Sequence, residues 1–412
     1  IKGIGIEAIS ASVLVVWGGA TLGYYSVEHV IAVALGWPFL LASTVAAIAL
    51  WIALDKLSKT QTAADSQAEV PYGPLDKALH DFAFASPERQ IRLGMFETRI
   101  FRRRIDMDTT RKPVFITSLP RAGTTIMLEG LAALPPFASA TYQHMPFTLS
   151  PLLWGGFSRA FRKVGDKSER AHGDGIEVGM DSPEAFEEML WIAFWPKHFE
   201  GHQITPWTAD DHDPAFEVFF RTHMAKVVAT RRGATRYISK NNANIARLGL
   251  LEHLFPDASI VIPIRNPRAQ VQSLMTQHTR FDAMHAREPF ARRYMEGVGH
   301  FEFGAALRPI DFGQPHAEVM RPDNINFWLR YWIDAYQHVL ATAGPRTVFV
   351  DHDMLCTHPN VVLPELAAAI DLQGTEDMAA FAGMLRAPRP APDLPQASRD
   401  LLQRADILHA EL

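Results

Sequence analysis

The sequence lacks several features that would by themselves narrow its function. It holds a single cysteine, Cys356, in 412 residues, so no disulfide can form within the chain. The formal net charge is −5 at pH 7, which indicates no excess of basic residues for nucleic-acid binding. No internal repeat or low-complexity tract is evident. These absences exclude a disulfide-stabilised scaffold and a repeat array, and they disfavour a nucleic-acid-binding protein.

A metal site is also poorly supported, although the chain contains 17 histidines. His198 and His202 have the spacing of two ligands on one face of a helix. A zinc-protease motif requires a glutamate directly after the first histidine, and Phe199 stands there. Since no third ligand is obvious either, we predict that the protein binds no metal.

What the chain does contain is a stretch typical of phosphate binding, at residues 114–134. β-favouring residues lead into a turn marked by Pro120 and Gly123, and an apolar helical pattern follows, which predicts a strand, a tight loop and a helix. The N–H groups of such a loop and the dipole of the helix favour an anion. Gly123 allows close approach of the backbone, while the Thr124 and Thr125 hydroxyls and the Arg121 guanidinium add donors.

This loop is not a nucleoside-triphosphatase loop, because Thr124 stands where the Walker lysine belongs. Residues 119–125, Leu-Pro-Arg-Ala-Gly-Thr-Thr, instead resemble the 5′-phosphosulfate loop of sulfotransferases that use 3′-phosphoadenosine 5′-phosphosulfate (PAPS). Tyrosylprotein sulfotransferases and a broad bacterial group carry Pro-Arg-Ser-Gly-Thr-Thr there. The resemblance implies that the sulfated end of the donor binds to Arg121, Ala122, Gly123, Thr124 and Thr125.

A second motif follows in the expected order. Residues 236–242 and 258–265 each predict a strand followed by a helix, and such alternation favours a parallel α/β sheet. The run Arg265-Asn266-Pro267-Arg268, with Ser273 beyond it, resembles the 3′-phosphate motif of the same family, in which Arg265 and Ser273 would hold the phosphate. Lys240 resembles an active-site lysine of tyrosylprotein sulfotransferases, which would stabilise charge on the leaving 5′-phosphate.

The resemblance also gives a candidate proton acceptor, His144, in Tyr142-Gln143-His144-Met145-Pro146. Cytosolic sulfotransferases place a catalytic histidine before a Leu-Pro pair, and tyrosylprotein sulfotransferases place a catalytic glutamate at nearly this distance from the loop. Histidine suits the role, because its ordinary pKa lies near neutrality. If His144 is not the base, Asp181 and Glu184 are the next candidates. Both lie at 181–184, where the pattern predicts the start of a helix.

The interval 150–207 is rich in aromatic residues. Aromatic side chains at this density usually form a core, and we expect that of most of them. In sulfotransferases the same interval shapes the acceptor pocket, so some of these side chains could line an apolar channel.

Two hydrophobic stretches near the start predict a membrane anchor. Residues 30–54 contain no charged side chain and carry Trp37 and Trp51 near the two ends, as expected for a bilayer-spanning helix. Residues 8–25 form a shorter, weaker span. Lys2 lies before the first stretch and Lys56 follows the second, so the positive-inside rule predicts a hairpin with both flanks in the cytosol. Residues 75–104 then have helical spacing and end in a cluster of arginines.

We therefore expect a transmembrane helical hairpin over residues 1–54, a juxtamembrane linker over 55–74, and a sulfotransferase domain over 75–412. This domain would have a P-loop-type α/β fold, a parallel sheet flanked by helices, and would face the cytosol, where PAPS is generally made. The acceptor would be a hydroxyl of a small molecule or, more specifically, of a membrane lipid. A P-loop kinase using ATP and a non-catalytic membrane scaffold stay open as alternatives, as do the acceptor's identity and the oligomeric state.

Overall fold

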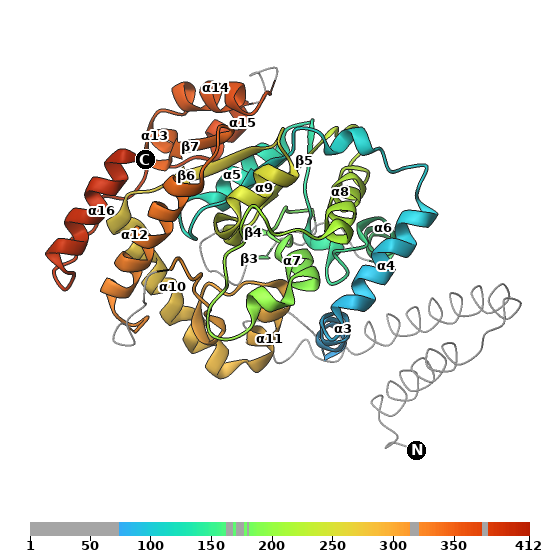
Figure 1. Ribbon diagram of the computed structural model, residues 1–412, viewed down its shortest axis with the longest axis horizontal. Coiled ribbons are helices and arrows are strands. Elements are labelled where there is room, and N and C mark those ends of the chain that lie inside the picture. Colours follow the sequence, from blue (N-terminus) through green and yellow to red (C-terminus); the bar gives the residue numbers. More distant parts are fainter. Residues whose placement is uncertain (1–73, 162–167, 170–176, 179–180, 314–320, 373–377) are drawn as a thin grey trace, which may run out of the picture. The chain divides into compact units, whose positions relative to one another are not determined.

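The computed structural model describes most of the chain after the predicted linker. The described residues are 74–161, 168–169, 177–178, 181–313, 321–372 and 378–412 (Figure 1). The predicted transmembrane hairpin, residues 1–54, and the linker up to residue 73 lie outside these ranges. Within them, no helix is both long enough and apolar enough to cross a bilayer.

A parallel sheet of five strands, in the order β2-β5-β1-β6-β7, forms the centre of the domain. Its strands are β1 (Val114–Ile116), β2 (Phe137–Ala138), β5 (Arg236–Lys240), β6 (Ser259–Ile264) and β7 (Thr347–Asp351). A short antiparallel pair, β3 (Ser168–Glu169) and β4 (Glu177–Val178), lies apart from it. The central strands are buried on both faces, as expected when helices cover a parallel sheet. The predicted α/β fold with a parallel sheet flanked by helices is thus confirmed.

Helices pack on both faces of the sheet. The α-helices are α3 (Pro74–Phe84), α4 (Pro87–Ile100), α5 (Thr124–Ala133), α6 (Pro151–Phe161), α7 (Glu188–Phe194), α8 (Pro214–Val228), α9 (Leu248–Leu254), α10 (Pro267–Arg287), α11 (Pro289–Val298), α12 (Ile325–Thr342), α13 (His352–Thr357), α14 (Pro359–Ala369), α15 (Met378–Met384) and α16 (Arg399–Glu411). Short 3-10 turns are η1 (Met107–Thr110), η2 (Tyr142–His144), η3 (Pro196–Phe199), η4 (Asn242–Ala246) and η5 (Gly304–Ala306).

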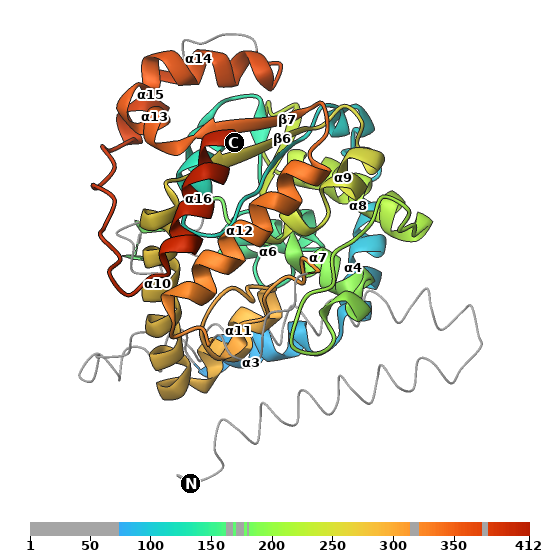
Figure 2. The same cartoon turned by 60° about the vertical axis from the view of Figure 1, so that its left-hand side comes forward.

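Two apolar clusters result from the alternation of side chains along the strands. Val114 and Ile116 of β1 face the smaller cluster, which includes residues of α5, α14 and α15. Phe115 faces the larger one and contacts Phe220 of α8 and Phe255 after α9. The last helix, α16, packs along α12 beside this larger layer (Figure 2).

The helical spacing over residues 75–104 is confirmed up to Ile100, and the chain forms two helices there. α3 ends at Phe84, and α4 begins at Pro87 after Ser86, whose hydroxyl accepts a hydrogen bond from the Arg89 N–H. A serine cap followed by proline at the first helical position is a strong helix start, and proline cannot continue a preceding helix.

The predicted helix start at 181–184 is wrong. Pro183 pairs with Thr141 in an antiparallel bridge, and the Glu184 N–H donates to the Ala140 carbonyl at 3.0 Å. These long-range backbone bonds override the local capping signal, so the helix begins only at Glu188.

His198 and His202 do not share a helix face. His198 belongs to η3, which ends at Phe199, and its ring stacks on Trp207 with centroids 4.1 Å apart. In the described part of the chain, no three His, Cys, Asp or Glu residues are grouped as metal ligands would be. The aromatic interval does supply core side chains, since Trp191 and Trp207 are buried.

An ion pair buried between α4 and α8 fixes these helices to each other. The Lys226 ammonium lies 3.0 Å from Glu97, and both side chains are almost fully buried. Lys226 also donates to the Gly94 and Leu149 carbonyls, each at 3.0 Å. Burial raises the pKa of Glu97 and lowers the pKa of Lys226, so each charge depends on the other.

We predict that Lys226→Met lowers the free energy of unfolding by about 3–5 kcal/mol, because it leaves the Glu97 carboxylate buried without a cation. Urea denaturation measures the change. Lys77→Met is the matched control, because the Lys77–Glu288 pair is partly solvent-exposed and such a pair contributes roughly 1 kcal/mol or less. Equal losses in the two variants would contradict the prediction.

Candidate active site

The predicted phosphate-binding loop, residues 117–123, connects β1 to α5. Gly123 caps α5 with a φ of 92°, and Arg121 has a φ of 70°, so two residues of the loop adopt the left-handed conformation. The buried Ser118 hydroxyl donates a hydrogen bond to the Pro263 carbonyl at 2.8 Å and forms another with the Tyr336 hydroxyl at 2.7 Å. The loop is therefore held in a fixed shape at the start of a helix, where the helix dipole favours an anion.

The arginines of the two sequence motifs come together beside this loop. The Arg121 Nε donates to the Ser273 hydroxyl at 3.0 Å, and the Arg265 Nη1 donates to the Arg121 carbonyl at 2.8 Å. Burial and then the charge of Arg121 lower the pKa of Arg265. Two like charges are thus held close together at the starts of α5 and α10, which makes this place suited to an anionic ligand.

Lys240 ends β5, and its partner in the sheet register is Ile116, the last residue of β1. Successive strand residues point to opposite faces, so Lys240 shares the face of Ile238, which belongs to the smaller cluster on the α5 side. Lys240 is mostly buried, with 7% exposure. The predicted lysine therefore lies at the same carboxyl edge of the sheet as the loop.

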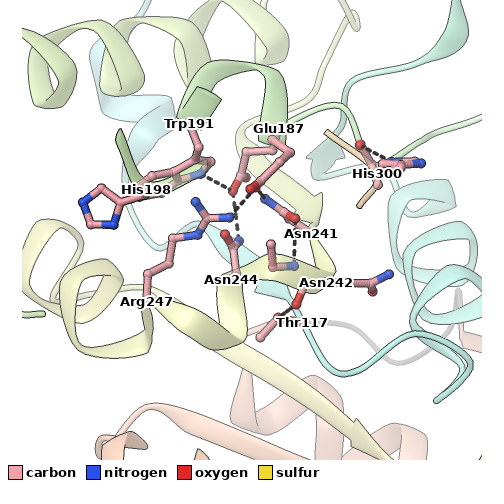
Figure 3. A network of polar contacts seen from close by, with 12 residues as sticks. Thr117, Glu187, Trp191, His198, Asn241, Asn242, Asn244, Arg247 and His300 are labelled. Atoms are coloured by element: carbon pink, nitrogen blue, oxygen red, sulfur yellow. Dashed lines mark hydrogen bonds and ion pairs between the residues drawn. The ribbon is translucent and has the colours of Figure 1, made fainter. Parts of the chain in front are cut away.

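A buried polar network holds the strand end that carries Lys240 (Figure 3). On the face opposite Lys240, Glu187, the residue before α7, accepts hydrogen bonds from the Ser239 hydroxyl and, at 2.9 Å, from the Asn244 amide. Glu188 accepts from the Asn241 amide at 2.5 Å and forms an ion pair with Arg247. Two adjacent carboxylates thus hold the residues on either side of Lys240.

Arg247 is in turn enclosed by aromatic rings. Its guanidinium lies 4.1 Å from the centroid of Trp191 and 4.4 Å from that of Trp207, on which His198 stacks. Burial raises the pKa of Glu188 and lowers the pKa of Arg247, so the pair stays charged only through mutual contact.

Asn242, which the sequence did not single out, connects the loop to a further carboxylate. The Thr124 hydroxyl donates to the Asn242 Oδ1 at 3.2 Å, and the Asn242 Nδ2 donates to the Glu302 Oε1 at 3.0 Å. The Thr117 hydroxyl also donates to the Asn242 carbonyl at 3.3 Å. The position of Asn242, just beyond the carboxyl end of a parallel strand, was the signal that could have identified it.

His352 is the other site residue that the sequence did not reveal. It directly follows β7, and a Cβ added to Gly123 would lie 2.2 Å from its Cδ2 atom. Its Nδ1 lies 3.3 Å from Asp353, while burial lowers the pKa of the ring. His352 therefore forms one wall of the loop, and only glycine fits opposite it.

His144 is placed differently from the other predicted residues. It is 2% exposed, and its Nδ1 accepts the Thr141 N–H at 3.0 Å. Gly155 of α6 lies close to its ring, and His144 contributes, after burial and Lys226, to lowering the pKa of His223 on α8. Because Nδ1 is the acceptor in the cap, proton uptake by the neutral ring would break that hydrogen bond. Its role as catalytic base stays a prediction.

Comparisons with known proteins bear on the part of the chain that holds these residues. The sulfotransferase family profile matches residues 113–307. No curated protein matches the chain significantly. Solved structures that it resembles are sulfotransferase STF1 from Mycobacterium tuberculosis, with 14% identity, coverage of 78% of this chain and 82% of that one, and a TM-score of 0.40. STF9 from Mycobacterium avium has 14% identity, 83% and 86% coverage, and a TM-score of 0.47.

A sulfotransferase from Alicyclobacillus acidocaldarius has 14% identity, 73% and 92% coverage, and a TM-score of 0.32. These structural likenesses are too distant to assign an activity or a substrate. The loop, Lys240, Arg265 and Ser273 all lie within the matched segment. Residues 113–307, which carry the two motifs, are thus similar to the sulfotransferase family.

Proposed function

We propose that the protein transfers a sulfuryl group from PAPS to a hydroxyl acceptor. The observation that carries the proposal is the junction of Arg121, Arg265 and Ser273, which joins the two predicted donor motifs by hydrogen bonds of 3.0 and 2.8 Å. An anion that contacts both guanidinium groups would relieve their mutual repulsion and form charge-assisted hydrogen bonds.

The donor has anionic groups at two ends of one nucleoside, and the site offers two cationic places. Arg265 and Ser273 would hold the 3′-phosphate, as the family resemblance implies. The sulfated 5′ end would lie at the loop, where the Arg121 guanidinium supplies donors beside the backbone N–H groups of Ala122, Gly123, Thr124 and Thr125. The close fit of Gly123 against His352 supports a loop shaped for backbone contact with phosphate.

The chain's own residues then supply positioning and charge stabilisation. Arg121 and Lys240 would stabilise the negative charge that develops on the leaving 5′-phosphate oxygen. The Glu187 and Glu188 carboxylates hold the strand end that carries Lys240, so this ammonium needs little reorganisation when that charge develops.

A kinase is less well supported, because Thr124 stands where the Walker lysine belongs. In addition, ATP has no 3′-phosphate that Arg265 and Ser273 could bind. A non-catalytic scaffold would not need Lys240 at the edge where the loop lies. Both alternatives remain outcomes of the experiments below.

We further propose a membrane-associated acceptor, such as a lipid-borne alcohol, reached by a domain on the cytosolic side. This proposal rests on the uncharged stretch 30–54 in the sequence. An anchored enzyme would meet an acceptor in the bilayer, whereas a water-soluble acceptor gives no reason for an anchor.

Stabilisation by nucleotides tests the identity of the donor. A ligand that binds only the folded state stabilises it by about 2.7 kcal/mol at a hundredfold excess over its Kd. Adenosine 3′,5′-bisphosphate should therefore raise the Tm, and ATP should raise it much less. Arg265→Ala should abolish the difference, whereas Arg268→Ala should not, because Arg268 pairs with Asp406 on the surface. Equal shifts with both nucleotides would favour the kinase.

Substitution of Gly123 tests the contact between the loop and the donor. Gly123→Ala should abolish stabilisation by adenosine 3′,5′-bisphosphate, because its Cβ would overlap His352 and distort the backbone that faces the ligand. Gly233→Ala is the control, since Gly233 also has a positive φ but no atom lies within 4 Å of an added Cβ. That control should lower the free energy of unfolding by about 1–2 kcal/mol and leave ligand binding intact. Unchanged ligand binding in Gly123→Ala would contradict the proposed contact.

Labelling of membrane extracts tests the class of acceptor. Membranes that contain the full chain, incubated with ³⁵S-labelled PAPS, should yield label in the organic-solvent extract, and Arg265→Ala membranes should not. Protease added to sealed cells should fail to cleave the chain after Asp55, because that part is expected in the cytosol. Label confined to water-soluble products would contradict a membrane acceptor without contradicting the donor.

A further inference from the structure

Glu302 places a carboxylate next to the donor loop. Its Oε1 accepts the Asn242 Nδ2 at 3.0 Å, and the same Asn242 accepts the Thr124 hydroxyl at 3.2 Å. Thr124 is the first residue of α5. Glu302 is thus two hydrogen bonds away from the loop that would hold the reactive end of the donor.

The chain around Glu302 fixes this position. Phe301 and Phe303 are buried on either side, while Glu302 itself is partly exposed. The Gly304 N–H donates to His278 at 3.0 Å, and the His300 Nε2 lies 3.0 Å from the Ala185 carbonyl. Two buried rings and two polar contacts therefore anchor a segment whose only carboxylate lies at the site.

One oxygen of Glu302 remains able to accept a proton. Across the described ranges, Asn242 is the only hydrogen-bond donor to this side chain, and it uses Oε1. The amide orientation of Asn242 is fixed, because its oxygen accepts from Thr124 while its nitrogen donates to Glu302. Asn242 therefore acts as a positioning residue for the carboxylate.

The other candidate bases are less suitably placed. Glu184 is 4% exposed, and its two oxygens accept the Tyr142 hydroxyl at 2.8 Å and the Ala185 N–H at 2.8 Å. His144 uses its acceptor nitrogen in a cap. Asp181 lies in an exposed turn. Glu302 alone among these combines partial exposure with a hydrogen-bonded connection to the loop.

We propose that Glu302 is the catalytic base, which takes the proton of the acceptor hydroxyl. As it does so, the acceptor oxygen forms a bond to sulfur, and the bond between sulfur and the 5′-phosphate oxygen breaks. The electron pair of that bond stays on the phosphate, near Arg121 and Lys240, and the proton later passes from Glu302 to water. This inference rests on the proposed sulfuryl transfer.

The test compares acceptors that differ in acidity. With PAPS as donor, Glu302→Gln should transfer sulfuryl groups to 1-octanol about 10²- to 10⁴-fold more slowly than the unmodified chain. Transfer to 4-nitrophenol at mildly alkaline pH, where this phenol is already mostly ionised and needs no base, should stay within about threefold. A merely structural role would reduce both rates alike. Glu296→Gln is the control, because Glu296 pairs with Arg292 on the surface of α11.

Stabilisation by adenosine 3′,5′-bisphosphate separates this inference from the proposal on which it rests. Glu302→Gln should keep that stabilisation. If it does and 1-octanol is used at the unmodified rate, Glu302 is not the base while the donor proposal stands. If His144→Asn, which can keep the cap, shows the acidity-dependent loss instead, His144 is the base. If the bisphosphate stabilises none of the variants nor the unmodified chain, both the donor proposal and this inference fail.

Discussion

The geometry of the site depends on two neighbouring carboxylates that are buried beneath the end of β5. Glu187 and Glu188 would be strongly unfavourable in this position without partners, because desolvation opposes their charge. Ser239, Asn241 and Arg247 supply those partners. Since the partners belong to the strand and the turns after it, satisfying the carboxylates also determines where the strand ends. Lys240 and Asn242 then project from a backbone with little freedom.

Single hydrogen bonds connect this strand end to the neighbouring segments of the site. Asn242 connects to Thr124 at the start of α5 and to Glu302 beyond α11. The loop is fixed independently, through Ser118 to Tyr336 of α12, and through Arg121 to Ser273 of α10. Segments distant in the sequence thus meet at one edge of the sheet, as expected for the carboxyl ends of parallel strands.

The sequence predicted those parts whose signals are local. β1 and β6 are short apolar runs bounded by polar residues, and the two motifs mark the turns after them. That β1 and β6 are neighbours in the sheet is known only from the structure. The helix start at 181–184 failed because Pro183 pairs with Thr141, a long-range contact that capping rules do not include. The burial of His144 and the positions of His352 and Glu302 depend on which segments pack together, and no local pattern encodes that.

The link from Ser118 to Tyr336 and the contact between Gly123 and His352 show that the loop is completed by residues beyond 307, where the family profile ends. β6 likewise has β7 as its neighbour on one side. A fragment limited to the matched segment would leave the edge of β6 open along five residue pairs, from Ile260 to Ile264, and would present unpaired N–H and C=O groups to other chains. The boundary of sequence similarity is therefore not a boundary of the packed structure, and a fragment that keeps the contacts of the loop must extend at least through His352.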